Sequence, residues 1–163
     1  GGLQKFIPEL LPLFAPNVNS FRRFLPDTSA PVNVEWGEEN RTVGLRVPEA
    51  TPQNRRVENR LPGADANPYL VAATVLAGIR HGMKNKIDPG PETTGNGYAD
   101  AQDAPPIPVD WRSAIEAAKA SAFLKDALGE EMHRTFTAII SAEYARVART
   151  VSEVDFDLYL HTV

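Results

Sequence analysis

The period at which apolar residues recur changes in the middle of this chain, from that of strands to that of helices, and that change limits the folds open to it. Two stretches, 32–36 and 42–47, alternate apolar with polar residues, which is the pattern of β-strands, and residues 55–61 are a third strand candidate. Asn67 and Pro68 suit the N-cap and the first position of a helix, and the residues that follow, 69–83, are apolar on nearly every side, which indicates a buried helix. Strands followed by helices predict an α+β fold. We expect antiparallel strands, with residues 37–40 forming a hairpin turn between the first two.

Helices are also expected near both ends of the chain. Apolar residues recur at helical spacing over residues 3–14, although two prolines interrupt the pattern. Asp110 can cap a helix that begins at the next residue, and Gly129 separates that helix from a second amphipathic stretch. Residues 111–151 are therefore predicted to form a helical pair. Residues 87–110 are rich in proline and glycine, which predicts a long loop before this pair.

Composition excludes several classes of protein and site. The chain has 163 residues, enough for one domain or a piece of a larger one, and no Cys, which excludes disulfides, thiolate zinc sites and a Cys nucleophile. Its three His residues do not show metal-ligand spacing. The net charge of -4 gives no basic field for nucleic acid, and no apolar run approaches the roughly 20 residues of a membrane span. We expect a cytoplasmic protein without nucleic-acid or membrane partners.

Arginine is concentrated in one third of the chain. Of the 17 basic residues 12 are Arg, and seven of these lie between Arg22 and Arg60, whereas Lys is absent between Lys5 and Lys84. The planar guanidinium group can bind a carboxylate or a phosphate through two parallel hydrogen bonds, which an ammonium group cannot do. This bias favours recognition of oxyanions. A surface with many ion pairs is the alternative, because several acidic residues lie in the same stretch.

The last predicted strand carries the pattern with the clearest chemistry. Arg56, Glu58 and Arg60 alternate with other residues, so in a strand they share one face, about 7 Å apart. The carboxylate is a hard oxygen ligand suited to Mg²⁺, and the guanidinium groups beside it can hold phosphate oxygens. Phosphoryl transfer requires such neutralisation of charge. The alternative is an exposed ladder of charges that stabilises the sheet.

Linked motifs in this region resemble those of the glutamine synthetase family. They occur in the family's order and near its spacing: Asn19-Ser20-Phe21-Arg22-Arg23-Phe24-Leu25-Pro26, Ala30-Pro31, Trp36, Asn40-Arg41, Arg46-Val47-Pro48, Arg56-Val57-Glu58-Asn59-Arg60 and Ala66-Asn67-Pro68-Tyr69-Leu70. Residues 1–163 resemble the C-terminal portion of that family's catalytic domain. Family members are much longer, so the chain resembles a fragment or a separately built domain.

The resemblance implies a role for each matching residue. Three arginines correspond to groups that bind substrate glutamate: Arg23, Arg41 and Arg60. Arg41 also corresponds to a catalytic residue that serves ATP and the transferred phosphoryl group. Arg46 and Arg56 match contacts to ATP, and Glu58 matches a ligand of Mg²⁺ or Mn²⁺. The implied reaction has two steps, in which ATP phosphorylates the γ-carboxylate of glutamate and an amine then displaces the phosphate.

Two positions depart from the pattern of the members that use ammonia. Those members carry a Glu two residues before the Pro that aligns with Pro31, on a flap that binds ammonium and accepts its proton, and Ser29 stands there in this chain. Gln53 takes the place of a Lys that contacts ATP in some members. A small neutral side chain at position 29 leaves room for a bulkier amine. Together with residues 63–70, this looks similar to the γ-glutamylpolyamine synthetase branch.

We therefore expect an ATP-dependent ligase that joins glutamate to an alkyl amine or a polyamine. An ordinary glutamine synthetase that uses ammonia is the first alternative, and a non-catalytic binding module derived from the family is the second. The resemblance also implies a ring-like homo-oligomer. Further metal ligands would lie in the part of the domain that the chain lacks, so residues 1–163 alone are expected to be inactive.

Overall fold

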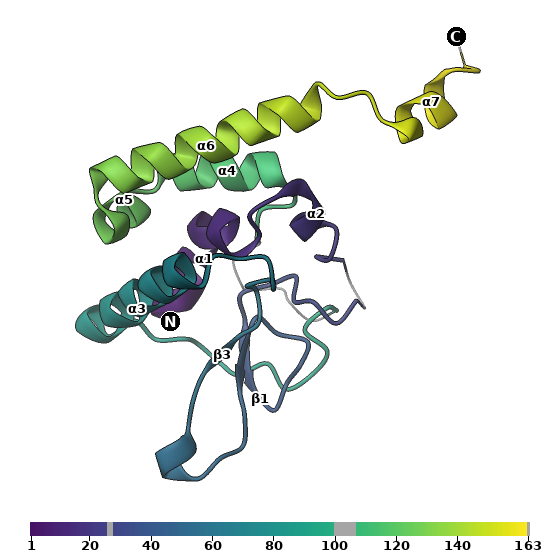
Figure 1. Ribbon diagram of the computed structural model, residues 1–163. Coiled ribbons are helices and arrows are strands. Elements are labelled where there is room, and N and C mark those ends of the chain that lie inside the picture. Colours follow the sequence, from purple (N-terminus) through teal and green to yellow (C-terminus); the bar gives the residue numbers. More distant parts are fainter. Residues whose placement is uncertain (26–27, 100–106, 163) are drawn as a thin grey trace.

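The computed structural model describes residues 1–25, 28–99 and 107–162, and the α+β class expected from the sequence is confirmed (Figure 1). Its elements are α1 (Gly2–Phe14), α2 (Val18–Phe21), β1 (Trp36–Glu38), β2 (Leu45–Val47), a 3₁₀ turn (Pro52–Asn54), β3 (Glu58–Asn59), α3 (Pro68–Asn85), α4 (Trp111–Ala120), α5 (Ala122–Leu128), α6 (Glu130–Ala148) and α7 (Glu153–Tyr159). Pro26 of the first family motif and residues 100–106 of the expected loop lie outside the described residues.

The helix α1 forms the centre of the core. It contacts α3, α4 and α5, and α6 packs over α4 and α5 (Figure 1). Ile7, Leu10 and Phe14 have no exposed surface, which confirms the helix predicted from apolar spacing. Pro8 and Pro12 lie inside this helix and cannot donate backbone hydrogen bonds. Burial of the apolar stripe offsets that loss.

The sheet differs from the expected hairpin. Its strands lie in the order β1-β2-β3, and β1 pairs with β2 in parallel, with Trp36 opposite Leu45. The hairpin turn predicted over residues 37–40 is therefore wrong. Residues after β1 instead loop back before β2 begins, and Glu39 adopts a positive φ of 51° within that loop. Only the pairing of β2 with β3 is antiparallel.

The expected long loop packs against the open edge of β1. The Thr93 amide donates to the Trp36 carbonyl oxygen at 3.0 Å, and Trp36 Nε1 donates to the Gly90 carbonyl oxygen at the same distance. Residues 87–99, the described part of this loop next to the sheet, contain neither helix nor strand, as their proline and glycine content predicts. The loop therefore acts as a cover for the strand edge.

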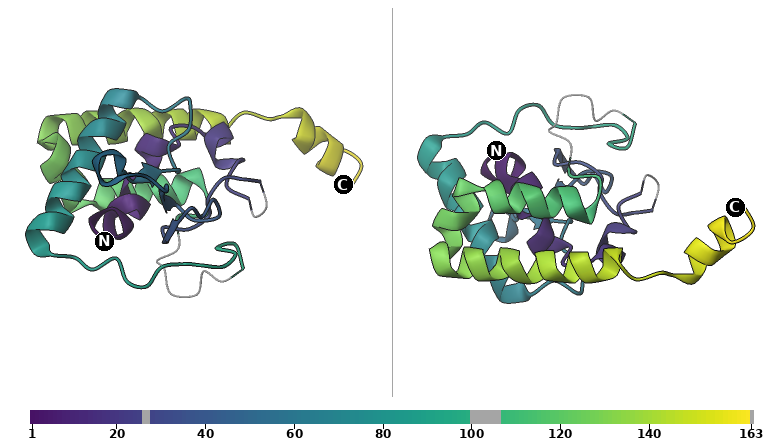
Figure 2. Two further views of the ribbon diagram at one scale, coloured as in Figure 1. Left: turned by 90° about the horizontal axis from the view of Figure 1, so that it is seen from below. Right: turned by 90° about the horizontal axis from the view of Figure 1, so that it is seen from above.

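The C-terminal helices are divided more finely than the sequence suggested. Asp110 caps α4 by accepting a hydrogen bond from the Ser113 amide at 2.7 Å, as its position predicts. A break at Ser121 then separates α4 from α5, and Gly129, at a φ of 82°, separates α5 from α6. Beyond residue 150, α7 stands away from the rest of the molecule in both views of Figure 2.

The helix α3 begins where the sequence predicts, with Asn67 as its N-cap, but it is not buried in this chain. Tyr69, Leu76 and Met83 are 84%, 64% and 76% exposed. The helix approaches α1 through a small-residue face, and a β-carbon at Gly82 would lie 2.8 Å from the Gly2 nitrogen. The rest of its apolar surface has no cover within the described residues, so the expectation of a buried helix is wrong here.

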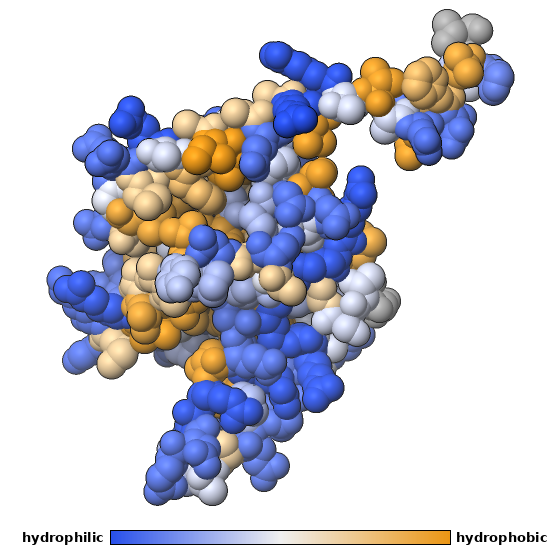
Figure 3. Space-filling view, in the orientation of Figure 1, coloured by the Kyte–Doolittle hydropathy of each residue, from blue (hydrophilic) through white to orange (hydrophobic). Residues whose placement is uncertain are grey.

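The surface divides by character. In Figure 3 the projecting segment that carries the 3₁₀ turn is hydrophilic, whereas apolar residues gather over the helices. Within the described ranges, no helix is long and apolar enough to cross a membrane.

Candidate functional site

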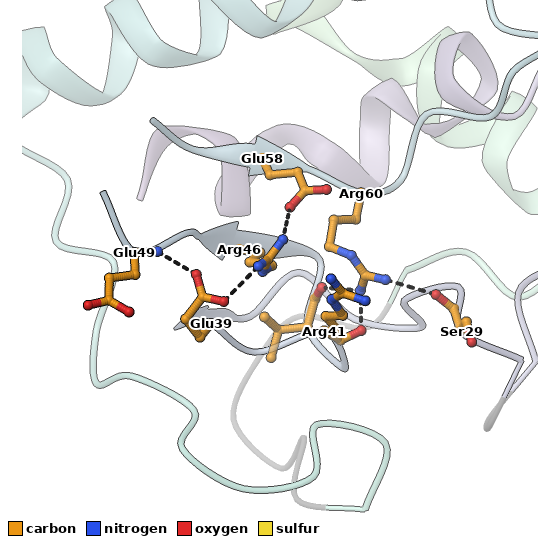
Figure 4. A network of polar contacts seen from close by, with 8 residues as sticks. Ser29, Glu39, Arg41, Arg46, Glu49, Glu58 and Arg60 are labelled. Carbon is orange, nitrogen blue, oxygen red and sulfur yellow. Dashed lines mark hydrogen bonds and ion pairs between the residues drawn. The ribbon is translucent and has the colours of Figure 1, made fainter. Parts of the chain in front are cut away.

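Arg46 on β2 lies between two carboxylates (Figure 4). Its Nη1 is 2.9 Å from Glu58 Oε2, and its Nη2 is 2.7 Å from Glu39 Oε2. The antiparallel register explains the first pair, because Arg46 is directly opposite Glu58 across β2 and β3. The hydrogen bond from Arg46 is the main reason that the pKa of Glu39 is lowered, and the pKa of Arg46 is raised, chiefly by the same bond. This fork of hydrogen bonds fixes the guanidinium group at the sheet.

Arg60, the residue after β3, donates hydrogen bonds to backbone groups of two other segments of the chain (Figure 4). Its Nη1 donates to the carbonyl oxygens of Arg41 and Val43, the latter at 3.1 Å. Its Nη2 donates to the Ser29 carbonyl oxygen at 2.9 Å. Ser29 is exposed and has a φ of 64°, which is uncommon for a residue other than glycine. Arg60 thus holds the position expected to select the amine next to the loop that carries Arg41.

The structure therefore brings five predicted site residues into one region of the sheet: Ser29, Arg41, Arg46, Glu58 and Arg60. The expectation that Arg56, Glu58 and Arg60 lie along one face of the same strand is wrong in detail. The strand β3 comprises only Glu58 and Asn59, and Arg56 lies before it and is exposed. Glu58 pairs across the sheet with Arg46 instead of along the strand with Arg56 and Arg60.

Arg23 is held by different partners. It follows α2, and its Nη2 donates to the Leu61 carbonyl oxygen directly after β3. Its guanidinium carbon lies 4.2 Å from the centre of the Phe24 ring. Its Nε is buried and has no hydrogen-bond partner among the residues that the structure describes, and burial lowers the pKa of the group. Arg23 therefore presents a guanidinium group that the protein has partly desolvated and fixed in place.

Three polar residues at the site were not singled out in the sequence. Asn33 falls in the first predicted strand, yet it is 3% exposed and connects backbone groups of three segments. Glu39 falls in the expected hairpin turn and binds Arg46. Asp65 accepts hydrogen bonds from Ser20 and Asn17. Little in the sequence indicates that these residues belong to the site, because polar residues in a turn or an alternating strand are usually exposed.

The sheet has an apolar side as well as a charged one. A cavity of about 470 Å³ lies between the sheet, the start of α1 and the end of α3. Leu45 and Val47, the neighbours of Arg46 on β2, line it together with Trp36, Ile79 and Met83. Successive residues of a strand point to opposite faces, so β2 separates the apolar cavity from the charged group around Arg46.

Glu58 is the residue suited to hold a divalent cation. Its side chain is 44% exposed, and only one of its oxygens accepts a hydrogen bond from Arg46. Mg²⁺ requires about six oxygen ligands, and the residues that the structure describes contain no group of three or more His, Cys, Asp or Glu placed to bind a metal. The donor chemistry therefore fits one ligand of a larger set, to which substrate, water or further carboxylates would contribute.

Comparisons with known proteins identify the family. Residues 1–159 match the model described as glutamine synthetase, catalytic domain. The chain is 38% identical over 159 residues to gamma-glutamylputrescine synthetase PuuA of Escherichia coli, covering 98% of this chain and 33% of that protein. It is 34% identical over 166 residues to the glutamine synthetase of Methanosarcina mazei, covering 98% of this chain and 37% of that one.

A solved structure supports the same relation. The structure titled "Apo GmaS without ligand" superimposes with a TM-score of 0.86 at 30% sequence identity, covering 98% of this chain and 37% of that one. The chain thus spans about a third of the length of the relatives that it matches. The resemblance seen in the motifs is confirmed, and the chain belongs to the glutamine synthetase family.

Proposed function

We propose that the complete protein carrying this chain is an ATP-dependent ligase that joins the γ-carboxyl group of glutamate to an alkyl amine or a polyamine. The observation that carries this proposal is Ser29. It is exposed next to the arginine group, and its carbonyl oxygen is bound by Arg60 at 2.9 Å. A hydroxyl group has no useful basicity at neutral pH and no charge with which to attract ammonium.

The proposed reaction couples two transfers. A γ-carboxylate oxygen of glutamate attacks the γ-phosphorus of ATP and ADP leaves. The amine nitrogen then attacks the acyl carbon, phosphate leaves, and the nitrogen loses a proton to give the amide. Arg23 and Arg60 would bind glutamate, and Arg41 would stabilise the charge on the phosphoryl oxygens. A divalent cation at Glu58, when bound, would neutralise part of the same charge.

Arg46 and Arg56 are proposed to contact ATP. Arg46 already donates to Glu39 and Glu58, so nucleotide phosphates would have to compete with two carboxylates or use its remaining N–H groups. Arg56 is exposed and precedes β3, which leaves its side chain accessible to a nucleotide. These two assignments depend on the family resemblance more than on contacts within this chain.

A second candidate is a glutamine synthetase that uses ammonia. The 34% identity to the enzyme of Methanosarcina mazei favours it, because that relative is matched over 98% of this chain as well. Similarity to gamma-glutamylputrescine synthetase and to the gamma-glutamylethanolamide synthetase GlnA4 of Streptomyces coelicolor, at 38% identity over 137 residues, favours the amine ligase. The choice of amine therefore needs a direct test.

We further propose that the complete protein acts in the cytoplasm as a ring-like homo-oligomer. ATP and glutamate are its proposed substrates, and Mg²⁺ or Mn²⁺ its proposed metal. Exposed apolar residues on α3 and α7, such as Leu76 and Phe156, support self-association, because contiguous apolar surface is usually covered.

The test is a panel of amines on the complete enzyme, read as phosphate release. The kcat/KM value for putrescine or ethylamine should exceed that for ammonia, because buried methylenes contribute about 0.8 kcal/mol each. Ser29→Glu should raise kcat/KM for ammonia about 10-fold or more, since a charged hydrogen bond contributes about 1.5–3 kcal/mol. Thr94→Glu, at another exposed position, controls for added charge alone. Preference for ammonia by the unmutated enzyme would establish the second candidate.

A further inference from the structure

A carboxylate outside the group around Arg46 joins two parts of the chain that lie far apart in sequence. Asp65 lies between β3 and α3, and its Oδ2 accepts a hydrogen bond from Ser20 Oγ at 2.6 Å. The same oxygen accepts a second bond from Asn17 Nδ2 at 3.0 Å. Both bonds hold α2 against the segment that leads from the sheet into α3. They are the main cause of the lowered pKa of Asp65.

The helix held in this way is too short to be stable alone. It comprises four residues, Val18–Phe21, and a single helical turn does not gain enough backbone hydrogen bonds to offset its entropy cost. The Asn17 side chain links this turn to Asp65. Its Oδ1 accepts a hydrogen bond from the Ser20 amide at 3.1 Å, and its Nδ2 donates one to Asp65. Asp65 therefore fixes both the cap and the third residue of this turn.

Arg23 follows this turn directly and lies beside Asp65. A β-carbon placed on Gly63 would be 2.5 Å from Asp65 Oδ1 and 3.5 Å from Arg23 Nε, so both side chains pack against the same glycine. The Arg23 guanidinium also donates to the Leu61 carbonyl oxygen and lies over the Phe24 ring. The backbone at residues 17–21 thus determines where the stem of Arg23 begins.

We propose that Asp65 is a positioning residue for the binding of glutamate, which acts by fixing the α2 turn and, through it, Arg23. This inference rests on the proposed function, in which Arg23 binds a carboxylate of glutamate. Asp65 does not contact that substrate in this account. Its role is geometric, because the hydrogen bonds from Ser20 and Asn17 require an acceptor at this place and not a negative charge.

Substitutions in the complete enzyme separate geometry from charge. Asp65→Ala removes the acceptor, and the KM for glutamate should rise about 10-fold while the KM values for ATP and the amine change less than about 2-fold. Asp65→Asn keeps an oxygen that can accept both bonds, so it should restore the KM for glutamate to within about 3-fold of the unmutated value. Asp126→Ala, an exposed carboxylate on α5, is the matched control.

Three results would overturn the proposal. One is an unchanged or lowered KM for glutamate in Asp65→Ala, which would mean that the carboxylate only opposes the charge of Arg23. Another is a change of similar size in kcat and in the KM values for glutamate, ATP and the amine, which would indicate general destabilisation. The third is an Asp65→Asn variant as impaired as Asp65→Ala, since the charge would then matter and not the acceptor.

Failure of the proposed function has a separate signature. If the unmutated enzyme releases no phosphate with any amine, the ligase assignment fails, and hydrogen exchange then tests the positioning role. Asp65→Ala should speed exchange of the described amides in residues 17–25 at least about 5-fold relative to Asp126→Ala. Equal exchange in the two variants would refute the role of Asp65 independently of catalysis.

Discussion

Asn33 gives the sharpest prediction about how the charged region is held in place. Its Nδ2 donates to the Gly97 carbonyl oxygen at 2.9 Å, and its Oδ1 accepts from the amides of Gly44 and Glu35 at 3.2 and 3.1 Å. With 3% exposure, the side chain has little water to replace these bonds. It thereby joins the segment before β1, the loop that carries Arg41 and the cover formed by residues 87–99.

Replacement of Asn33 by Ala leaves the buried backbone groups of Gly44 and Gly97 without their partner. Each buried group left unsatisfied costs about 1–3 kcal/mol, so the loss for the two groups should reach about 2–6 kcal/mol. In a chain of 163 residues, about 1 kcal/mol lowers Tm by ~2–4 °C. The melting temperature of Asn33→Ala, followed by far-ultraviolet circular dichroism, should therefore fall by about 4–24 °C.

Asn96→Ala is the matched control. Asn96 is exposed, and its side chain accepts one hydrogen bond, from the Tyr98 amide at 3.1 Å. Water can replace that bond, so the Tm of Asn96→Ala should be lower than that of the unmutated protein by about 2 °C or less. If Asn33→Ala melts no lower than Asn96→Ala, the buried network does not hold these segments together and the reasoning is refuted.

Three further predictions concern catalysis, the isolated chain and pH. Glu58→Gln keeps the shape but removes the charge, so in the complete enzyme phosphate release should fall by about 10²-fold or more, and near-normal release would argue against Glu58 as a metal ligand. Residues 1–163 alone should show no ligase activity and only weak binding of Mg-ATP, because one carboxylate rarely retains Mg²⁺; micromolar binding by calorimetry would contradict this. Asp110→Ala should lower the free energy of unfolding by about 0.5–2 kcal/mol at neutral pH. Hydrogen bonds from Ser113 lower the pKa of Asp110, so this stabilisation is present above the unfolded value of about 3.9 and is lost as the pH falls through the lowered folded value. Urea titrations of the two proteins should converge in strong acid, and a constant difference would contradict the role of the ionised cap.

The helices were the part of the fold most accessible from sequence. Apolar residues at spacings of three and four predicted α1 and most of α6, and Asn67 and Asp110 marked the starts of α3 and α4. The same pattern could not show that α3 is exposed. Periodicity identifies an apolar surface, but the chain that covers it need not be adjacent in sequence.

The sheet was predicted less well, for a physical reason. Alternation predicted strands over residues 32–36 and 42–47, whereas β1 covers Trp36–Glu38 and β2 covers Leu45–Val47. The segment before β1 is bonded to Thr93 and Gly97, more than 50 residues away along the chain. Asn33 is a polar position of the alternation in residues 32–36, and the local sequence does not show that Gly44 and Gly97 are its partners. Pairing across a sheet is a tertiary property, and short strands carry little local information about it.

The candidate site shows the same division. Arginine bias and the strand motif identified the residues that the structure gathers at the sheet, including Arg46, Glu58 and Arg60. Their exact partners could not be predicted from sequence. Glu39, the partner of Arg46, lies in a loop and has a positive φ, and Arg60 binds Ser29 through the backbone carbonyl oxygen, which every residue type has.

The central claim, that the complete enzyme amidates glutamate with an alkyl amine or polyamine, is tested most directly by competition in one vessel. The enzyme would receive ATP, Mg²⁺ and glutamate with equal concentrations of ammonium and putrescine, and mass spectrometry would quantify the two products. The ratio of products equals the ratio of the kcat/KM values for the two nitrogen donors. We expect γ-glutamylputrescine to exceed glutamine at least about 10-fold. Glutamine as the main product would contradict the proposed preference for an alkyl amine or a polyamine.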